Sequence, residues 1–300
     1  MHGVLVVDKP EGPTSHDVVA WARRALGTRA VGHAGTLDPM ATGALVLAIG
    51  EGTKLVPYLT LDEKEYDFEL VLGSETDTLD AQGAVVAEAE VPALDEETVR
   101  RVASGFVGPQ QQRPPAYSAI KVDGVALHRR ARRGEAVEAP LRAVTVHALR
   151  LRSLAPLAFS VRASKGFYVR SLGRDLARAL GTVGHLGALR RTASGPFRVQ
   201  DALPGALLSA ARGDEALRPS VRARVMPLEQ AVLGMPRTTL DAHGAADARA
   251  GRAVRPVPAS LEDGAVVAML GPAGELVAIG ERRGDALAVR RGFRTFAVDG

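Results

Sequence analysis

An aspartate in a glycine-rich segment is the first residue whose type and surroundings suit chemistry. Asp38 lies in VGHAGTLDPMATG, residues 31–43, which also holds three glycines and His33, and a proline follows the aspartate directly. Proline disfavours the α conformation at the preceding residue, so Asp38 is predicted in an extended loop. The pattern also fits an aspartate that only caps a helix. The glycines favour a functional loop, because they let another backbone or a ligand approach closely.

A stripe of arginines is the second candidate. Arg170, Arg174 and Arg178 are spaced i, i+4, i+8 in SKGFYVRSLGRDLARAL, so a helix carries them on one face. Arg170 falls in the first turn of that helix, where the dipole disfavours a cation. Helix stability therefore does not explain Arg170, whereas a carboxylate or phosphate partner does. Arg174 and Arg178 are equally well explained as a solvated face.

Composition excludes several kinds of chemistry. The 300 residues include no cysteine, which excludes disulfides, thiolate metal sites and cysteine nucleophiles. The sequence also lacks the GxxxxGK[ST], HExxH, GxGxxG and EF-hand patterns. We therefore expect side chains to do the chemistry without a cofactor or a metal.

Location and partners follow from charge and hydropathy. The longest run without a charged residue spans the 12 residues 39–50, too short to cross a membrane, and the N-terminus does not resemble a secretory signal. A cytoplasmic protein is expected.

The charge is distributed unevenly along the chain. Residues 1–150 hold 16 basic and 21 acidic residues, whereas residues 151–300 hold 22 basic and 13 acidic residues. The basic half, and above all its cluster at 162–198, favours a polyanionic partner.

Strands interspersed with helices must position these residues. Strands are predicted at 3–10, 44–50, 64–73, 84–90, 143–151 and 158–164, and helices from Ser15 towards Gly27, at 96–106 and at 169–180. Gly181, Gly184 and Gly187 are interpreted as helix-ending and turn glycines. In KEYDFELVLG, Tyr66 alternates with charged residues and is predicted to point towards the core or a cleft. The absence of a regular βαβ rhythm favours an α+β fold with a mixed sheet.

The chain is predicted to form two domains. Beyond Pro236 it becomes rich in glycine and strand-like, with two hairpins in AVVAMLGPAGELVAIGERRGDALAVRRGF. We expect a catalytic domain over residues 1–234 and a small β-barrel over 235–300.

Five segments, in this order, resemble the TruB family of tRNA pseudouridine synthases over roughly residues 3–200. They are GVLVVDKPEGPTSHDVV, GHAGTLDPMATG, KEYDFELVLGSETDTLDAQG, QQQRPPAYSAIKVDG and SKGFYVRSLGRDL. The terminal segment resembles a PUA RNA-binding domain through its position and AGRAVRP. An unrelated small barrel remains an alternative for it.

The resemblance implies roles for individual residues. Asp38 is expected to be the catalytic aspartate, Tyr66 to lie against the target uracil, and Arg170 to pair with Asp38. Leu189 is similar to a pocket-lining leucine and His33 to a histidine that holds the T loop open. The substrate-binding residues expected in all are His33, Lys165, Tyr168, Arg174 and Leu189. Two residues depart from the family pattern, His128 where tyrosine is common and Phe167 where threonine is common.

The implied reaction is isomerisation of uridine to pseudouridine in the T loop of tRNA, expected at position 55. The reaction breaks the C1′–N1 bond and joins C1′ to C5, so it needs no net redox change and no cofactor. Attack of the carboxylate on C1′, removal of a sugar proton and addition to C6 remain open. A monomer that works without a protein partner is expected. The alternatives are a guide-RNA-dependent subunit and a non-catalytic tRNA chaperone or RNA-binding protein.

Overall fold

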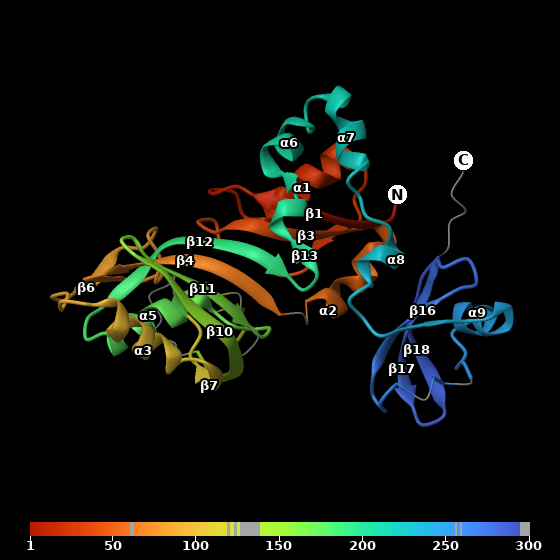
Figure 1. Ribbon diagram of the computed structural model, residues 1–300. Helices are drawn as coiled ribbons and strands as arrows, with labels where there is room; N and C mark the ends of the chain where they lie inside the picture. The colour runs from red at the N-terminus through yellow and green to blue at the C-terminus, as the bar shows by residue number, and fades with distance from the viewer. Residues whose placement is uncertain are drawn as a thin grey trace.

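One long mixed sheet organises most of the chain (Figure 1). The computed structural model describes residues 1–60, 63–118, 121–122, 125–126, 139–255, 257–258 and 260–294. In these residues the sheet has ten strands, in the order β14-β1-β3-β12-β4-β11-β10-β7, with β13 paired to β12 and β2 to β3. The strands are β1 (Gly3–Lys9), β2 (Val31–His33), β3 (Thr42–Ile49), β4 (Lys64–Leu72), β7 (Gly108–Gln112), β10 (Arg142–Leu154), β11 (Leu157–Ala163), β12 (Gly184–Ser194), β13 (Phe197–Arg198) and β14 (Leu203–Pro204).

The two halves of the sheet meet where β3 pairs with β12 in parallel. The register joins Thr42 to Arg190 and Gly43 to Arg191, whereas β12 pairs with β4 in antiparallel fashion over most of its length. Gly43 has a φ of +100°, and a Cβ there would lie 2.2 Å from the carbonyl oxygen of Arg191. Only glycine fits this position. The prediction that a glycine of the Asp38 segment admits another backbone is confirmed.

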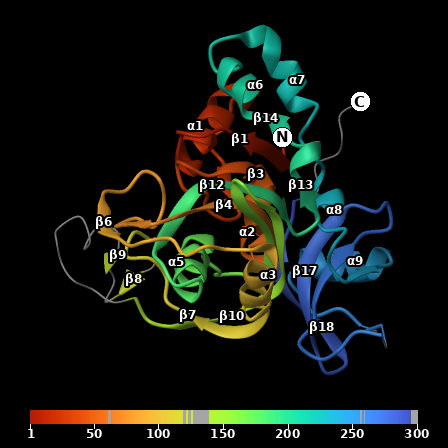
Figure 2. The ribbon, with the colours of Figure 1, turned by 60° about the vertical axis from the view of Figure 1, so that its left-hand side comes forward.

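Helices cover both ends of the sheet. At one end α6 (Gly205–Ala210) packs on β1, α1 (Ser15–Leu26) packs on β2, and α7 (Arg218–Arg222) packs on α1 (Figures 1 and 2). At the other end α3 (Glu96–Ser104) packs on β10, and α5 (Val169–Ala179) packs on β12 and β4. The short helices are α2 (Val56–Leu59), α8 (Leu228–Ala231) and the 3₁₀ turns η1 (Gly50–Leu55), η2 (Val199–Asp201) and η3 (Glu215–Leu217). Two-stranded pairs are formed by β5 (Ser74–Thr76) with β6 (Val85–Glu88) and by β8 (Lys121–Val122) with β9 (Val125–Ala126).

The N-cap of α1 corrects one expectation. Thr14, not Ser15, caps this helix, because its hydroxyl accepts a hydrogen bond from the backbone N–H of Asp17 while the Asp17 carboxylate accepts from the backbone N–H of Thr14. This reciprocal arrangement is a capping box. Ser15 becomes the first helical residue, and its side chain is free to bond elsewhere.

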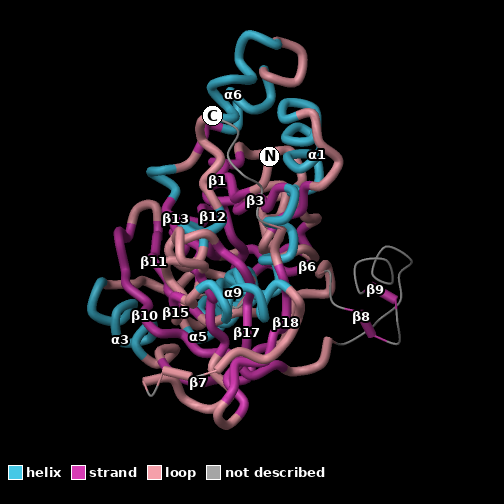
Figure 3. The backbone as a smooth tube through the Cα atoms, turned by 90° about the vertical axis from the view of Figure 1, so that its right-hand side faces the viewer, coloured by secondary structure: helices cyan, strands magenta, loops and turns pink. Residues whose placement is uncertain are grey.

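A second sheet is formed by the last part of the described chain. Its four strands are β15 (Arg237–Thr239), β16 (Val266–Leu270), β17 (Leu276–Arg283) and β18 (Ala286–Gly292), and α9 (Ala242–Arg249) packs on it (Figure 3). The two hairpins predicted there are present as β16-β17 and β17-β18.

This sheet is not separate from the first. One buried apolar cluster joins residues of β1 and β3 to residues of β16 and β17, including Val4, Val46, Ala268 and Ile279. The domain boundary after residue 234 stays a prediction.

The α+β fold with a large mixed sheet is confirmed. The structure differs from the prediction at β12, because Gly184 and Gly187 lie within that strand and are not turn glycines. A Cβ at Gly184 would lie 2.7 Å from the Cβ of Ala177 and 2.8 Å from the carbonyl oxygen of Val71. These glycines therefore let α5 and β4 pack closely on β12.

Candidate active site

Asp38 lies in the loop between β2 and β3, which contains no helix. Because β3 begins at Thr42, the alternative that Asp38 caps a helix is wrong. The loop is held from α1, where the Ser15 hydroxyl donates to the carbonyl oxygen of Leu37 (3.0 Å) and accepts from the Leu37 N–H (2.8 Å). The backbone directly before Asp38 is thus fixed by two hydrogen bonds.

A buried lysine fixes the other side of the loop. The ammonium of Lys9, at the end of β1, donates to the carbonyl oxygens of Pro10, Pro13 and Pro39 at 2.9, 2.7 and 3.2 Å. The Lys9 side chain is fully buried. Burial lowers the pKa of Lys9 from 10.5 to about 8, although the nearby carboxylate of Asp38 partly opposes the shift.

We expect Lys9 to make stability depend on pH. Because its pKa is lower in the folded chain, the folded protein releases a proton that the unfolded chain retains between about pH 8 and 10.5. Stability therefore rises with pH in that window, by up to about 1.4 kcal/mol per pH unit, and this gain is lost as pH falls through about 8. Denaturant unfolding at pH 7.5, 8.5 and 9.5 should show wild type gaining stability relative to Lys9→Met. Lys165→Met, at an exposed lysine, is the control. If the difference in unfolding free energy between wild type and Lys9→Met stays constant with pH, the lowered pKa of Lys9 is contradicted.

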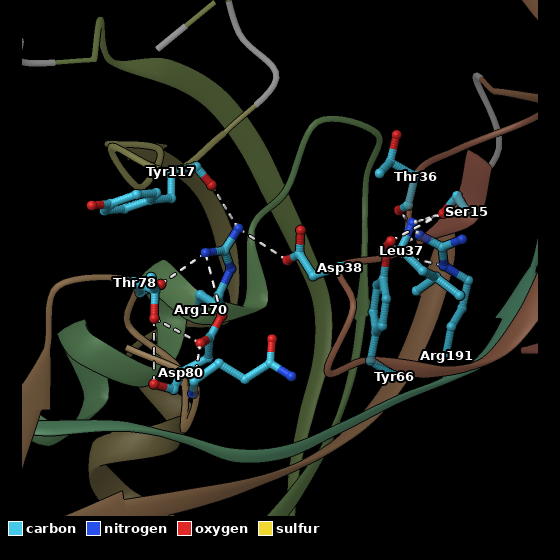
Figure 4. Close-up of polar contacts among 11 residues, drawn as sticks. Ser15, Thr36, Leu37, Asp38, Tyr66, Thr78, Asp80, Tyr117, Arg170 and Arg191 are labelled. Atoms are coloured by element: carbon cyan, nitrogen blue, oxygen red, sulfur yellow. Dashed lines mark hydrogen bonds and ion pairs between the residues drawn. The ribbon is translucent and has the colours of Figure 1, made fainter. Parts of the chain in front are cut away.

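Arg170 makes the predicted ion pair with Asp38 (Figure 4). Its Nη2 lies 2.9 Å from Asp38 Oδ2 and also donates to the carbonyl oxygen of Tyr117 (2.9 Å), while Nη1 donates to the carbonyl oxygen of Thr78 (2.8 Å). Arg170 is only 4% exposed, whereas the Asp38 side chain is 35% exposed. No described residue bonds to the second oxygen, Asp38 Oδ1, so one oxygen is held and the other is available to a ligand.

A second carboxylate, that of Asp80, lies close to the other terminal nitrogen of Arg170. Asp80 Oδ2 lies 3.5 Å from Arg170 Nη1, and Asp80 is buried. The hydroxyl of Thr78 (2.7 Å) and the backbone N–H of Gln82 (3.1 Å) donate to Asp80 Oδ1. The preceding residue, Leu79, has a left-handed backbone with a φ of 62°. Such a conformation costs roughly 1–2 kcal/mol, and the buried packing of Leu79 offsets it.

Arg191 ties Tyr66 to the Asp38 loop (Figure 4). The guanidinium is buried and donates to the Tyr66 hydroxyl from Nε (3.3 Å) and Nη2 (3.2 Å). The same group donates to the carbonyl oxygens of Gly35 (3.1 Å) and Thr36 (2.7 Å). Tyr66 lies on the buried face of β4, as its alternation predicted. One side chain therefore sets the position of the tyrosine relative to the aspartate loop.

A cavity of about 700 Å³ gathers most of the predicted residues. It is lined by Asp38, Tyr66, Arg170, His33, Tyr168 and Leu189, and by Phe167, which departs from the family pattern. Lys165 and Arg174 are not among the described residues that line it. Lys165 is exposed, and Arg174 donates to Asp175 at 2.8 Å. Their substrate-binding roles stay predictions, and His128 lies outside the described residues.

The environment of His33 and Tyr168 favours their neutral forms. Burial, together with the charges of His16 and Arg191, lowers the pKa of His33, and burial raises the pKa of the Tyr168 hydroxyl. The His33 Nδ1 is buried with no hydrogen-bond partner in the described part of the chain. The cavity thus presents the second carboxylate oxygen of Asp38 and several aromatic side chains, beside the charged groups of Lys64, Asp80, Arg170 and Arg191. A flat ring can pack against the aromatic faces of such a lining.

Asp80, Arg191 and Lys9 were missed by sequence reasoning. Asp80 and Lys9 lie within quoted segments, and Arg191 lies in HLGALRR, but nothing local shows that they are buried. The only signal is at Asp80, which lies between Leu79 and Ala81, because a charged residue between apolar neighbours needs a partner when it is buried.

Two family models match the chain. "TruB family pseudouridylate synthase (N terminal domain)" covers residues 23–169, and "tRNA pseudouridylate synthase B C-terminal domain" covers residues 170–233. The chain belongs to the TruB family. The predicted enzyme class, a pseudouridine synthase, is thereby confirmed.

Relatives match this TruB-family chain over most of its length. It is 47% identical to tRNA pseudouridine synthase B of Opitutus terrae over 77% of the chain and 95% of that protein. It is 39% identical to the protein of the same name from Deinococcus radiodurans, over 97% of the chain and 99% of that protein.

Solved structures share the fold. A Cbf5-Nop10-Gar1 complex contains a chain that matches with a TM-score of 0.75 at 27% identity, covering 97% of this chain and 85% of that one. An H/ACA RNP bound to a substrate RNA containing 2'-deoxyuridine matches with a TM-score of 0.73 at 27% identity, covering 98% and 85%.

The described residues form neither a membrane-spanning helix nor a cluster of metal ligands. No described helix is long and apolar enough to span a membrane. Across the same residues, no three His, Asp or Glu side chains come together as a metal site.

Proposed function

We propose that this chain isomerises uridine to pseudouridine in the T loop of tRNA, at position 55, with Asp38 as the catalytic group and without a cofactor. The observation that carries the proposal is the ion pair between Asp38 and Arg170 in a cavity that also contains Tyr66 and Leu189. The names of the relatives support tRNA as the substrate. The T-loop position rests on the resemblance of the motifs.

The proposed reaction begins with a uridine that leaves the base stack and enters the cavity, because an enzyme cannot reach C1′ and C5 of a stacked base easily. Asp38 Oδ2 stays on Arg170, and Oδ1 either attacks C1′ or removes a sugar proton. In either case the C1′–N1 bond breaks and its electron pair leaves with the uracil. The uracil rotates and C5 bonds to C1′. In the first route this breaks the bond between C1′ and the Asp38 carboxylate, and in the second route Asp38 returns the proton to the sugar. The C5 proton then departs. Arg170 keeps the aspartate oriented throughout.

The proposed role of Tyr66 is to stack on the uracil and to take the C5 proton. Tyr66→Phe keeps the ring and removes the hydroxyl, so we expect tRNA affinity to change little and the single-turnover rate to fall about 10²- to 10³-fold. Release of tritium from C5-labelled tRNA measures the rate. Tyr58→Phe, at a half-buried tyrosine of α2 outside the cavity lining, is the control. A nearly normal rate for Tyr66→Phe would show that the hydroxyl does not take the C5 proton and that Tyr66 only stacks on the uracil.

The experiment that tests the proposal incubates the purified chain with a tRNA transcript and no other RNA or protein. Pseudouridines are then mapped by chemical adduct and primer extension. Modification at position 55 alone is expected. Activity only with an added guide RNA would favour a guide-dependent subunit. Binding of tRNA without modification would favour a non-catalytic RNA-binding protein.

A cytoplasmic monomer that needs no protein partner completes the proposal. The charge asymmetry supports an RNA partner, and residues 235–300 are proposed to add contacts to RNA in the manner of a PUA domain. Sedimentation of the chain with and without tRNA tests the oligomeric state.

A further inference from the structure

Gln112 makes an unusual pair of hydrogen bonds. It is the last residue of β7 and is 3% exposed. Its Nε2 donates to the carbonyl oxygen of Tyr168 (3.0 Å), and its Oε1 accepts from the backbone N–H of Tyr168 (2.8 Å). The amide thus satisfies both backbone groups of a residue 56 positions away in the sequence.

The residue held in this way begins α5. Tyr168 is the N-cap of that helix and makes no side-chain capping bond, because a tyrosine cannot reach back to its own backbone as serine or aspartate does. The N-terminus of α5 is therefore fixed from outside, by Gln112, and the Ser171 hydroxyl adds a bond to the carbonyl oxygen of Arg113 (2.8 Å).

Arg170 follows two residues later, in the first turn of α5. From there its guanidinium reaches Asp38, Asp80 and the carbonyl oxygens of Thr78 and Tyr117. These contacts come from segments distant in sequence, so the position of the first turn decides whether all of them form together. A displacement of about 1 Å is enough to lower a rate by about 10²-fold.

We infer that Gln112 is a positioning residue for catalysis, which anchors the start of α5 and so holds Arg170 against Asp38. The inference rests on the proposed function of that ion pair. The inference assigns a role to the neutral side-chain amide of Gln112 at the end of β7. This amide bonds to the backbone of Tyr168 and is not in contact with Asp38 or Arg170. Its neighbour Gln111 is exposed and provides a matched control one residue away on the opposite face of the strand.

The first readout does not depend on activity. Hydrogen exchange of residues 168–172 should be faster in Gln112→Met than in wild type, and unchanged in Gln111→Met, because the Tyr168 N–H loses its acceptor. Gln112→Glu keeps the length and the acceptor oxygen but, when ionised, cannot donate to the Tyr168 carbonyl. We expect it to show an intermediate exchange rate, and it replaces Gln112→Met if that variant does not fold. Unchanged exchange in the folded Gln112 variant would overturn the inference.

The second readout is a double-mutant cycle at saturating tRNA. Gln112→Met should lower the single-turnover rate about 10- to 100-fold with little change in tRNA affinity, and Gln111→Met should not. In the Arg170→Lys background, Gln112→Met should lower the rate by less than about threefold, because its effect passes through Arg170. Equal losses in both backgrounds would overturn the inference. Failure of the proposed function is distinguishable, since it appears as an inactive wild type or a fully active Asp38→Asn.

Discussion

Asp38→Asn is expected to abolish pseudouridine formation while the protein remains folded and binds tRNA. An amide can neither attack C1′ as a nucleophile nor accept a sugar proton, so the single-turnover rate should fall below about one ten-thousandth of wild type. Stability should fall by only about 1–2 kcal/mol, because Arg170 keeps Asp80 and two carbonyl oxygens as partners. Tritium release from C5-labelled tRNA and denaturant unfolding measure the two effects.

The chain offers a matched control for this substitution. Asp8 is 33% exposed against 35% for Asp38, and it pairs with Arg190 at 2.8 Å, but it does not line the cavity. Asp8→Asn removes an ion pair whose carboxylate is similarly exposed, although its arginine is 42% exposed against 5% for Arg170. It should leave the rate within about twofold of wild type. Pseudouridine formation by Asp38→Asn at a measurable fraction of the wild-type rate would refute the catalytic assignment.

Arg170→Ala is expected to have the next largest effect. The substitution removes the cation that pairs with both Asp38 and Asp80. Asp38 Oδ2 then loses its partner, whereas Asp80 keeps the hydrogen bonds from Thr78 and Gln82 to its Oδ1. The rate should fall more than about 10³-fold, and removal of a buried partner should cost about 3–5 kcal/mol of stability. Rates are therefore measured at a temperature at which circular dichroism shows the variant folded.

Arg170→Lys separates charge from shape. Lysine keeps the positive charge but lacks the planar fork that reaches four partners at once, so a loss of about 10- to 100-fold is expected. Arg190→Ala, which removes the guanidinium of the control pair, should retain nearly full activity. If Arg170→Ala is as active as Arg190→Ala, the ion pair with Asp38 has no part in catalysis.

Much of the site could be predicted because its residues lie in contiguous motifs. The loop of Asp38 follows from the proline after it, the inward direction of Tyr66 from alternation along β4, and the first-turn position of Arg170 from the helical spacing around it. The partnership of Asp38 with Arg170 came from the resemblance, since no local pattern relates two residues so far apart.

The remaining features depend on tertiary contacts that leave no local signal. Gly184 resembles a turn residue until α5 and β4 are seen packed against it. Arg191 resembles a surface arginine in a basic cluster, yet the backbone carbonyls of the aspartate loop and the Tyr66 hydroxyl surround it. Lys165 and Arg174 share the motif of Arg170 but are not among the described residues that line the cavity. Lys165 is exposed in the loop before α5, and Arg174 lies one turn beyond Arg170 along the helix, where it donates to Asp175.

The apolar cluster shared by the two sheets has a mechanical consequence. η1 follows β3 directly, and in it Lys54 donates to the carbonyl oxygen of Gly292 while Glu51 accepts from the backbone N–H of Arg294, both at 3.0 Å. The shared cluster connects the terminal sheet to β1 and β3, and these bonds connect it to η1. When a macromolecule binds to the terminal sheet, we therefore expect any displacement of that sheet to displace β1 and β3, the strands beside the Asp38 loop, as well.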